Sequence, residues 1–153
     1  RDPEMSRGLG DVYKRQVMGD GELAEGSVWE GAMAAGHYRL SNLCAVVDRN
    51  GLQISGTTEA VMRQESQRDR WKSFGWNVLS AAGNDTAALK AAFDAAKQCT
   101  DKPTVILAET VKGCGVSFME NQAGWHHRVP TETEYAAAAA ELEVKRKEAE
   151  SRE

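Results

Sequence analysis

Two short, continuous apolar runs, separated by segments of helical periodicity, constrain the fold most strongly. The runs are Leu43–Val47 (LCAVV) and Thr104–Ala108 (TVILA), and each has the length of a strand that is buried on both faces. Apolar residues recur at helical spacing in Glu25–Gly36, and again in the segment that begins at Asn84 or Asp85. Strand–helix–strand units at this spacing predict an α/β fold, with a parallel sheet, helices on both faces and right-handed crossovers.

Weaker patterns complete the expected order of elements. A strand is predicted to end at Val17-Met18, because the turn signal Gly19-Asp20-Gly21 follows. Ser66–Phe74 is predicted as a short helix and Trp76–Leu79 as another strand. Gly36 is expected to cap the helix that precedes it, because glycine adopts the left-handed conformation of a helix C-terminus without strain.

The C-terminal part is predicted to be a separate helix. Thr131-x-x-Glu134 is a capping-box pattern, which opens a helix through the alanine run that follows. A mixed-charge stretch completes this helix and is most simply a solvated helical end. We therefore divide the chain into an α/β domain in 17–130 and a charged helix in 131–153.

The N-terminal residues differ from the rest. Residues 1–16 show neither the apolar period of a strand or helix nor the pattern of a secretory signal. Their end, Asp11–Gln16 (DVYKRQ), resembles the translation of a transposon end used in sequencing-library preparation. We expect a non-native, disordered leader, with the natural sequence starting at Val17; a genuine N-terminal arm is the alternative.

Composition excludes several classes of protein. At 153 residues and 41% hydrophobic content, the chain is long enough for one domain with a core. It has no long uncharged apolar run, and its net charge of -4 gives no bulk attraction to nucleic acid, so we predict neither a membrane nor a nucleic-acid partner. The 3 cysteines have no CxxC spacing, which argues against a disulfide framework or a structural zinc site and favours a cytoplasmic protein.

Two polar side chains follow neighbouring predicted strands. Asp20 stands where the first strand ends, and Gly21 after it has no side chain to keep a bulky anion away. Asn50 stands just past the second strand, and because parallel strands end on the same edge of a sheet, the two side chains are expected to converge there. A carboxylate, an amide oxygen and a loop carbonyl suit Mg²⁺ with a bound diphosphate, assisted by a helix N-terminus. A lone GDG would more often mark a turn; the pairing with Asn50 makes the site more specific.

The residues around this pair resemble the transketolase family. The stretches GDGELAEGSVWE and VVDRNGLQISG resemble its thiamine-diphosphate signature, and most closely that of the separately encoded N-terminal subunit of bacterial and archaeal transketolases. FGWNV, DKPTVILAETVKGCGVSFMEN and AGWHHRVP continue the resemblance in order, so that it covers Val17–Tyr135. The resemblance implies an incomplete thiamine-diphosphate-binding (PP-type) fold in 17–130. It also implies transfer of a two-carbon ketol unit from a ketose phosphate to an aldose phosphate, with thiamine diphosphate and Mg²⁺ (or Ca²⁺ or Mn²⁺ in its place) as cofactors.

The resemblance further implies roles for single residues. Asp20 and Asn50 would hold the metal ion through their side chains, and Leu52 would hold it through its backbone carbonyl. The full set of residues that match the cofactor-binding positions of the family is Gly19, Asp20, Gly21, Glu22, Asn50, Leu52, Ile54 and His126.

Four members of this set have other implied contacts. Gly21 and the amide of Glu22 match the positions that contact the diphosphate, and Ile54 matches an apolar residue that packs against the cofactor. His126 matches the histidine of a family His-Gly motif that approaches the diphosphate and the substrate, so it is the predicted catalytic residue. The residue after it is His127 where the family has glycine, and the direction of the His126 side chain therefore depends on the local backbone path.

Glu25 and Glu30 match glutamates that, in this family, lie near the contact between subunits. There they link the two cofactor sites through carboxylates and water. The alternative is structural, since acids in the first turn of a helix are favoured by its dipole, or both side chains are simply exposed. The two interpretations stay open for each residue.

The resemblance also implies sugar-phosphate substrates and a partner subunit. The family glutamate that faces the aminopyrimidine ring lies on a pyrimidine-binding domain absent here, so we expect a separately encoded C-terminal subunit. Family N-terminal subunits carry a further segment before the GDG motif, and we expect this chain alone to be inactive and prone to aggregate. The alternatives are another thiamine-diphosphate enzyme on the same scaffold, such as a deoxyxylulose-phosphate synthase, and a non-catalytic binding or regulatory module.

Overall fold

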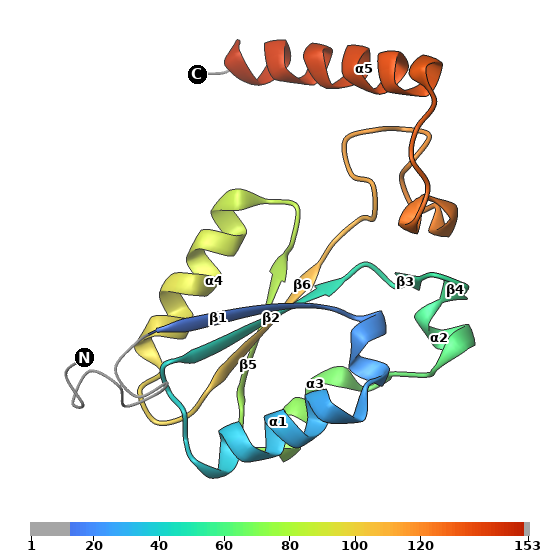
Figure 1. Ribbon diagram of the computed structural model, residues 1–153. Helices are drawn as coiled ribbons and strands as arrows, with labels where there is room; N and C mark the ends of the chain where they lie inside the picture. Colours follow the sequence, from blue (N-terminus) through green and yellow to red (C-terminus); the bar gives the residue numbers. More distant parts are fainter. Residues whose placement is uncertain (1–12, 152–153) are drawn as a thin grey trace, which may run out of the picture.

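The computed structural model describes residues 13–151 (Figure 1). Its centre is a four-stranded sheet in the order β1-β2-β6-β5, in which every neighbouring pair of strands is parallel. The strands are β1 (Lys14–Gly19), β2 (Leu43–Arg49), β5 (Asn77–Ala82) and β6 (Thr104–Glu109). The prediction of an α/β fold with a parallel sheet is therefore confirmed.

Helices cover both faces of this sheet. α1 (Gly26–His37) and α3 (Gln67–Ser73) pack on one face, and α4 (Thr86–Gln98) packs on the other (Figure 1). The remaining elements follow the carboxyl ends of β1, β2 and β6 along the chain. A 3-10 helix (Gly21–Ala24) follows β1; β3 (Leu52–Gln53), β4 (Gly56–Thr57) and α2 (Thr58–Val61) follow β2; a second 3-10 helix (Ala123–His126) and α5 (Glu132–Glu150) follow β6. The longer connections of the chain therefore leave the sheet at its carboxyl edge.

Side chains of β2 alternate between the two halves of the core. Ala45 and Val47 belong to the cluster that packs against α1 and α3, while Cys44 and Val46 belong to the cluster against α4, together with Ile106 of β6. Because both faces are covered, β2 and β6 are apolar over Leu43–Val47 and Val105–Ala108, which is why the sequence shows continuous apolar runs there and no alternation.

β1 begins earlier than predicted. Its first residues, Lys14–Gln16, pair in parallel with Leu43–Ala45 of β2, whereas the sequence pattern predicts a disordered leader up to residue 16. The reason is that ladder hydrogen bonds use backbone groups alone, so polar side chains on an edge strand do not prevent pairing. The prediction for residues 1–12 lies outside the described residues.

A mostly apolar cavity lies between α1 and this edge strand. Its volume is about 710 Å³, and Met18, Ala35 and Trp76 are among the residues that line it. Val17, also on β1, is 66% exposed. Open strand edges beside apolar surface favour self-association. Among residues 13–151 the outer edge of β1 has no partner strand, and aggregation of the chain alone stays a prediction.

Gly36 has a different role from the predicted one. The sequence predicts a helix over Glu25–Gly36, but α1 spans Gly26–His37, so Gly36 lies inside it and is not the C-cap. A Cβ at this position would lie 1.9 Å from the carbonyl oxygen of Phe74, at the end of α3. The glycine therefore permits a close approach between two helices.

Asp85 is the residue that caps α4. Its Oδ1 accepts hydrogen bonds from the N–H groups of Ala87 (2.8 Å) and Ala88 (3.2 Å), while Asn84 accepts one from the N–H of Val111. We expect Asp85→Ala to lower the free energy of unfolding by about 1 kcal/mol, because two amides of the helix N-terminus lose their acceptor. Asp85→Asn keeps an acceptor and is the matched control; equal urea midpoints for the two variants would contradict this assignment.

α5 is the predicted C-terminal helix. Thr131 Oγ1 accepts a hydrogen bond from the N–H of Glu134 (3.3 Å), and the N–H of Thr131 donates to Oε2 of Glu134 (2.9 Å), so the capping box is confirmed. The helix stands apart from the sheet (Figure 1). Within residues 13–151, no helix is long and apolar enough to cross a membrane.

Candidate functional site

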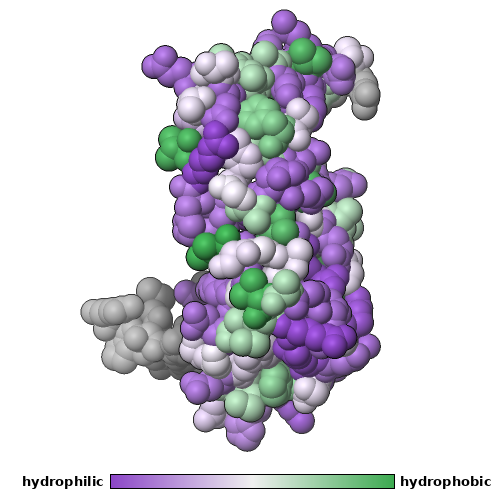
Figure 2. Space-filling view, turned by 90° about the vertical axis from the view of Figure 1, so that its right-hand side faces the viewer, coloured by the Kyte–Doolittle hydropathy of each residue, from purple (hydrophilic) through white to green (hydrophobic). Residues whose placement is uncertain are grey.

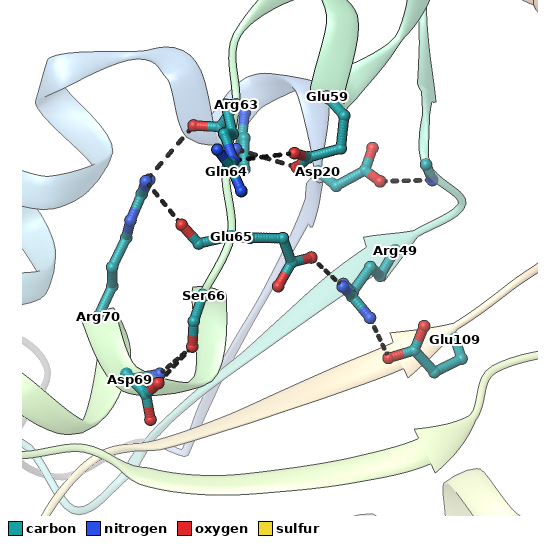
Figure 3. A network of polar contacts seen from close by, with 11 residues as sticks. Asp20, Arg49, Glu59, Arg63, Gln64, Glu65, Ser66, Asp69, Arg70 and Glu109 are labelled. Carbon is teal, nitrogen blue, oxygen red and sulfur yellow. Dashed lines mark hydrogen bonds and ion pairs between the residues drawn. The ribbon is translucent and has the colours of Figure 1, made fainter.

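Asp20 lies at the carboxyl end of β1 with its carboxylate buried. The residue is 1% exposed, and its Oδ2 accepts a hydrogen bond of 2.6 Å from the N–H of Gly51, in the turn after β2 (Figure 3). Its Oδ1 is buried and has no hydrogen-bond partner among residues 13–151. A buried carboxylate oxygen without a partner is costly, so this atom is well suited to bind a cation.

The amide of Asn50 is held in one orientation. Its Nδ2 donates to Oδ1 of Asp48 (3.2 Å), and its Oδ1 accepts from the N–H of Leu52 (3.0 Å). Asp48 also accepts a hydrogen bond from the hydroxyl of Thr110, which follows β6. The contact with a carboxylate fixes which amide atom is the nitrogen, and a second lone pair of the amide oxygen stays available for a ligand.

The environment of Asp20 opposes its ionisation. Burial raises the pKa of Asp20 above its ordinary value of 3.8, and the negative charge of Asp48 adds to the rise; hydrogen bonds from the amides of Gly51 and Gly21 act in the opposite direction. A divalent cation would stabilise the charged form, so ionisation of Asp20 and cation binding are coupled.

A cavity of about 650 Å³ opens at this edge of the sheet. Its walls come from the junction between β1 and α1, the turns after β2, and the connection before α5. Every residue that we predicted to bind the cofactor lines it, namely Gly19, Asp20, Gly21, Glu22, Asn50, Leu52, Ile54 and His126. The structure brings the predicted set together, and the roles of its members stay predictions.

Gly21 leaves room for Gln53 at the cavity wall. A Cβ at Gly21 would lie 2.8 Å from Oε1 of Gln53 and 2.9 Å from its Cβ. Any side chain at position 21 would therefore displace Gln53, which also lines the cavity. The missing side chain at position 21 therefore lets Gln53 keep its place in the cavity wall next to Asp20.

His126 reaches the cavity from the 3-10 turn Ala123–His126. The next residue, His127, has φ -123° and ψ 0°, a conformation that residues with a side chain adopt. Histidine in place of the family glycine therefore introduces no left-handed backbone, and His126 lies at the cavity. Desolvation lowers the pKa of His126, and electrostatic repulsion from Lys112 and from the neighbouring imidazole lowers it further.

Lys112 is a cavity residue that sequence reasoning missed. It lines the cavity in the connection after β6, within the stretch TVKGCG. Lysine is common on surfaces and no spacing marks this one, so its place could not be found without the fold. Its ammonium brings a positive charge to the cavity, which suits a bound anion such as a diphosphate.

Glu25 and Glu30 are both exposed. Glu25 directly precedes α1, forms no side-chain capping hydrogen bond within residues 13–151, and lines the cavity. Glu30 lies one turn into α1 and does not line it. The structure leaves both carboxylates available to another protein chain, and their interface role stays a prediction.

Arg49 links the carboxyl ends of β2 and β6 next to the site. Its guanidinium pairs with Glu109 at the end of β6 (2.7 Å) and with Glu65 before α3 (Figure 3). Such partly exposed pairs are individually weak. Their place matters more, because they join the carboxyl ends of β2 and β6 next to Asp48 and Asn50.

The predicted metal ligands belong to different chemical groups. Among residues 13–151, no three His, Cys, Asp or Glu side chains group as a metal site. The predicted ligands do not need such a group, since they are one carboxylate (Asp20), one amide (Asn50) and one backbone carbonyl (Leu52). Hard oxygen donors of this kind, with the unpartnered Oδ1 of Asp20, fit Mg²⁺, which completes its shell with water and phosphate oxygens.

Residues 4–149 match a family model described as the thiamine diphosphate binding domain of transketolase. The chain belongs to the transketolase family. The matched range begins inside residues 1–16, so it includes part of the stretch that we expected to be a non-native leader.

Curated relatives are named as transketolase subunits. The chain is 50% identical over 131 residues to an apulose-4-phosphate transketolase subunit of Phocaeicola vulgatus, which covers 85% of this chain and 47% of that protein. It is 43% identical over 127 residues to the 6-deoxy-6-sulfo-D-fructose transketolase subunit SqwG of a Clostridium species, with 83% and 46% covered. The chain thus spans about half the length of these relatives.

Solved transketolases share the fold. The transketolase of Campylobacter jejuni superposes with a TM-score of 0.81 at 29% identity, covering 86% of this chain and 21% of that one. A transketolase of Pichia stipitis in complex with sedoheptulose-7-phosphate gives a TM-score of 0.71 at 29% identity, covering 91% and 24%. The sheet and helices described above are therefore those of a transketolase N-terminal domain.

Proposed function

We propose that this transketolase-family chain supplies the diphosphate-binding half of a thiamine diphosphate site. With a C-terminal partner it would transfer a two-carbon ketol unit from a ketose phosphate to an aldose phosphate. The observation that carries this proposal is Asp20, whose buried Oδ1 has no partner in the described chain and which lines one cavity with Asn50 and His126. Thiamine diphosphate, when bound, supplies the electron sink for carbon–carbon cleavage; the task of the chain is to bind, orient and shield it.

The proposed metal ligands all offer hard oxygens. Asp20 and Asn50 would bind Mg²⁺ through their side chains, and Leu52 would bind it through its carbonyl. Ca²⁺ or Mn²⁺ would be accepted in its place, because carboxylate and carbonyl donors suit each of these ions. The support for this set is that its members line one cavity.

The proposed diphosphate site consists of backbone groups of Gly21 and Glu22 and the ammonium group of Lys112. Gly21 and the amide of Glu22 open the 3-10 turn Gly21–Ala24, where no side chain of Gly21 stands in the way. Lys112 would add a positive charge. Ile54, 61% exposed and part of the cavity wall, would offer an apolar side chain to the organic part of the cofactor.

His126 would donate or accept hydrogen bonds at the substrate. Its lowered pKa keeps the imidazole neutral at pH 7, so that one ring nitrogen is a donor and the other an acceptor. It can then hold a proton at a substrate or diphosphate oxygen without bringing a second full positive charge beside Lys112.

The proposed partner is a C-terminal subunit that carries a pyrimidine-binding domain. Relatives named as transketolase subunits support a split enzyme. Ile54 and Val61 line the cavity and are exposed, as is Met62 next to them, and on this side of the molecule hydrophobic patches lie among hydrophilic side chains (Figure 2). Glu25 and Glu30 would lie at the contact. Ketol transfer by the chain without a partner would contradict this part of the proposal.

The proposed substrates are ketoses and aldoses with an anionic group. The relatives are named for apulose-4-phosphate and for 6-deoxy-6-sulfo-D-fructose, which carry a phosphate and a sulfonate. Sugar phosphates are therefore the substrate class that we propose here. We also propose a cytoplasmic location, supported by the free thiols of Cys44, Cys99 and Cys114.

Thermal unfolding tests the proposed site. We expect thiamine diphosphate to raise the melting temperature only when Mg²⁺ is present, because a ligand that binds the folded state stabilises it. Lys112→Met should weaken this binding about tenfold, since a charge-assisted contact is lost. Lys90→Met on α4, whose ammonium pairs with Asp94, is the matched control. Absence of any stabilisation of the wild-type chain by the two ligands together would contradict the proposed function.

A further inference from the structure

The connection between β6 and α5 delivers both Lys112 and His126 to the cavity. We call residues 112–126 the cavity loop. It folds back on itself, because the N–H of Asn121 donates to the carbonyl of Lys112 (2.9 Å). Whatever holds this loop in place therefore holds both cavity side chains.

α5 contacts the cavity loop along one side of the helix. Oε2 of Glu141 accepts a hydrogen bond from the N–H of Ser117 (2.7 Å), and its Oε1 accepts one from the Ser117 hydroxyl (2.7 Å). One turn further on, Nζ of Lys145 donates to the carbonyl of Gly115 (2.9 Å). Leu142 packs here too, with Cδ2 at 3.3 Å from the place of a Cβ on Gly115.

α5 contributes little to the core of the described chain. None of its residues belongs to the two core clusters of residues 13–151, it stands apart from the sheet (Figure 1), and Ala138 is its buried residue. Other charged pairs, such as Arg146 with Glu143 (2.8 Å), lie within the helix. Core stability therefore does not explain its contacts with the cavity loop.

We propose that α5 acts as a strut for the cavity loop and that Glu141 is its positioning residue. Glu141 does not line the cavity; it acts through Ser117, and so keeps Lys112 and His126 at the cavity wall. Because the carboxylate of Glu141 accepts two hydrogen bonds from Ser117, it restricts the orientation of Ser117 more than a single hydrogen bond would. The Ser117 amide lowers the pKa of Glu141, so the acceptor is charged at neutral pH. The inference rests on the proposed function for its ligand, but its structural part is tested without one.

Hydrogen exchange of the full chain tests the strut directly. Glu141→Gln keeps the shape of the side chain and removes its charge. Its Oε1 can still accept from the Ser117 amide and its Nε2 can donate to the Ser117 hydroxyl, so two charge-assisted hydrogen bonds become weaker neutral ones. We expect amides of the cavity loop to exchange about tenfold faster, with those of β2 and β6 unchanged. Glu143→Gln, whose carboxylate pairs with Arg146 and Lys147 inside α5, is the matched control. Wild-type exchange of the loop in Glu141→Gln would overturn the proposal.

Titration of His126 by NMR tests positioning. Desolvation and the nearby charge of Lys112 both lower the pKa of His126 from its ordinary 6.5. In Glu141→Gln a loosened loop should let this pKa rise toward 6.5, while in Glu143→Gln it should not move. A role of Glu141 in folding alone would leave the titration unchanged, and an unchanged titration would overturn the proposal even if exchange is faster.

Binding of thiamine diphosphate with Mg²⁺ links the strut to function. Glu141→Gln should weaken binding about fivefold in the wild-type background, and have almost no effect in a chain that already carries Lys112→Met and His126→Ala. Equal losses in both backgrounds would overturn the positioning role. If the wild-type chain does not bind, the proposed function fails, and exchange and titration still decide whether the strut exists.

Discussion

Asp20→Asn is expected to abolish Mg²⁺-dependent binding of thiamine diphosphate and, at pH 7, to raise the melting temperature of the ligand-free chain. Both effects have one origin: within residues 13–151, the buried Oδ1 of Asp20 has no partner and its Oδ2 bonds to the amide of Gly51. An Asn carbonyl still accepts from Gly51, so the variant keeps that contact and loses a buried charge. The cation loses its one carboxylate ligand, and we expect its affinity to fall at least ~100-fold.

The gain in stability depends on pH with a definite sign. Burial raises the pKa of Asp20 in the folded chain above its ordinary 3.8. The folded state therefore binds this proton more tightly than the unfolded state does, and the wild type loses stability as the pH rises through the interval between the two pKa values. Asn does not titrate, so the advantage of the variant is complete at neutral pH and shrinks as the pH falls toward 3.8.

Scanning and titration calorimetry measure these two effects separately. Asp94→Asn removes a carboxylate from the surface of α4, where it pairs with Lys90 and Lys97, and should change neither quantity appreciably. Wild-type affinity in Asp20→Asn would remove this residue from the site. A variant less stable than the wild type at pH 7 would show that Oδ1 has a partner in the ligand-free protein.

The buried strands could be predicted because burial on both faces leaves a continuous apolar run. Leu43–Val47 and Thr104–Ala108 lie inside β2 and β6. The start of β1 could not be predicted, because Lys14–Gln16 are polar and an edge strand needs only its backbone to pair. The pattern of apolar side chains indicates which strands are buried. It does not indicate where a strand at the edge of the sheet begins.

The convergence of Asp20 and Asn50 could be predicted from topology. Parallel neighbours end on one edge, and β1 and β2 are indeed neighbours. The contact between Asp48 and Thr110, which orients Asn50, joins residues far apart in the chain. It depends on β6 lying next to β2, and no local pattern contains that information.

Lys112 and Glu141 were missed for a related reason. Each acts through a tertiary placement, Lys112 at the cavity wall and Glu141 against Ser117. Charged residues in a loop or on a solvated helix look alike in sequence whether or not they meet a partner. The capping box of Thr131 and Glu134 was found because both of its contacts are local.

Gly36→Ala is expected to destabilise the chain by about 3 kcal/mol. In an exposed helix interior, alanine in place of glycine normally stabilises by up to about 1 kcal/mol. At Gly36 this gain is outweighed, because the new Cβ would lie 1.9 Å from the backbone oxygen of Phe74. A backbone atom cannot move aside as a flexible side chain does, so α1 and α3 would have to separate. Their separation would also strain the hydrogen bond from Trp76 Nε1 to the carbonyl of Ala32 (2.9 Å).

Gly31→Ala provides the matched comparison in the same helix. A Cβ at Gly31 meets nothing within 4 Å among the described residues, so only the intrinsic preference of the helix acts there, and this variant should be more stable than the wild type by a few tenths to about 1 kcal/mol. Urea unfolding of the two variants measures the difference, and similar m-values would show that the folded state is equally compact in both. If Gly36→Ala unfolds at the same urea concentration as Gly31→Ala, the close approach of α3 to α1 is not a feature of the protein, and glycine at position 36 has another cause.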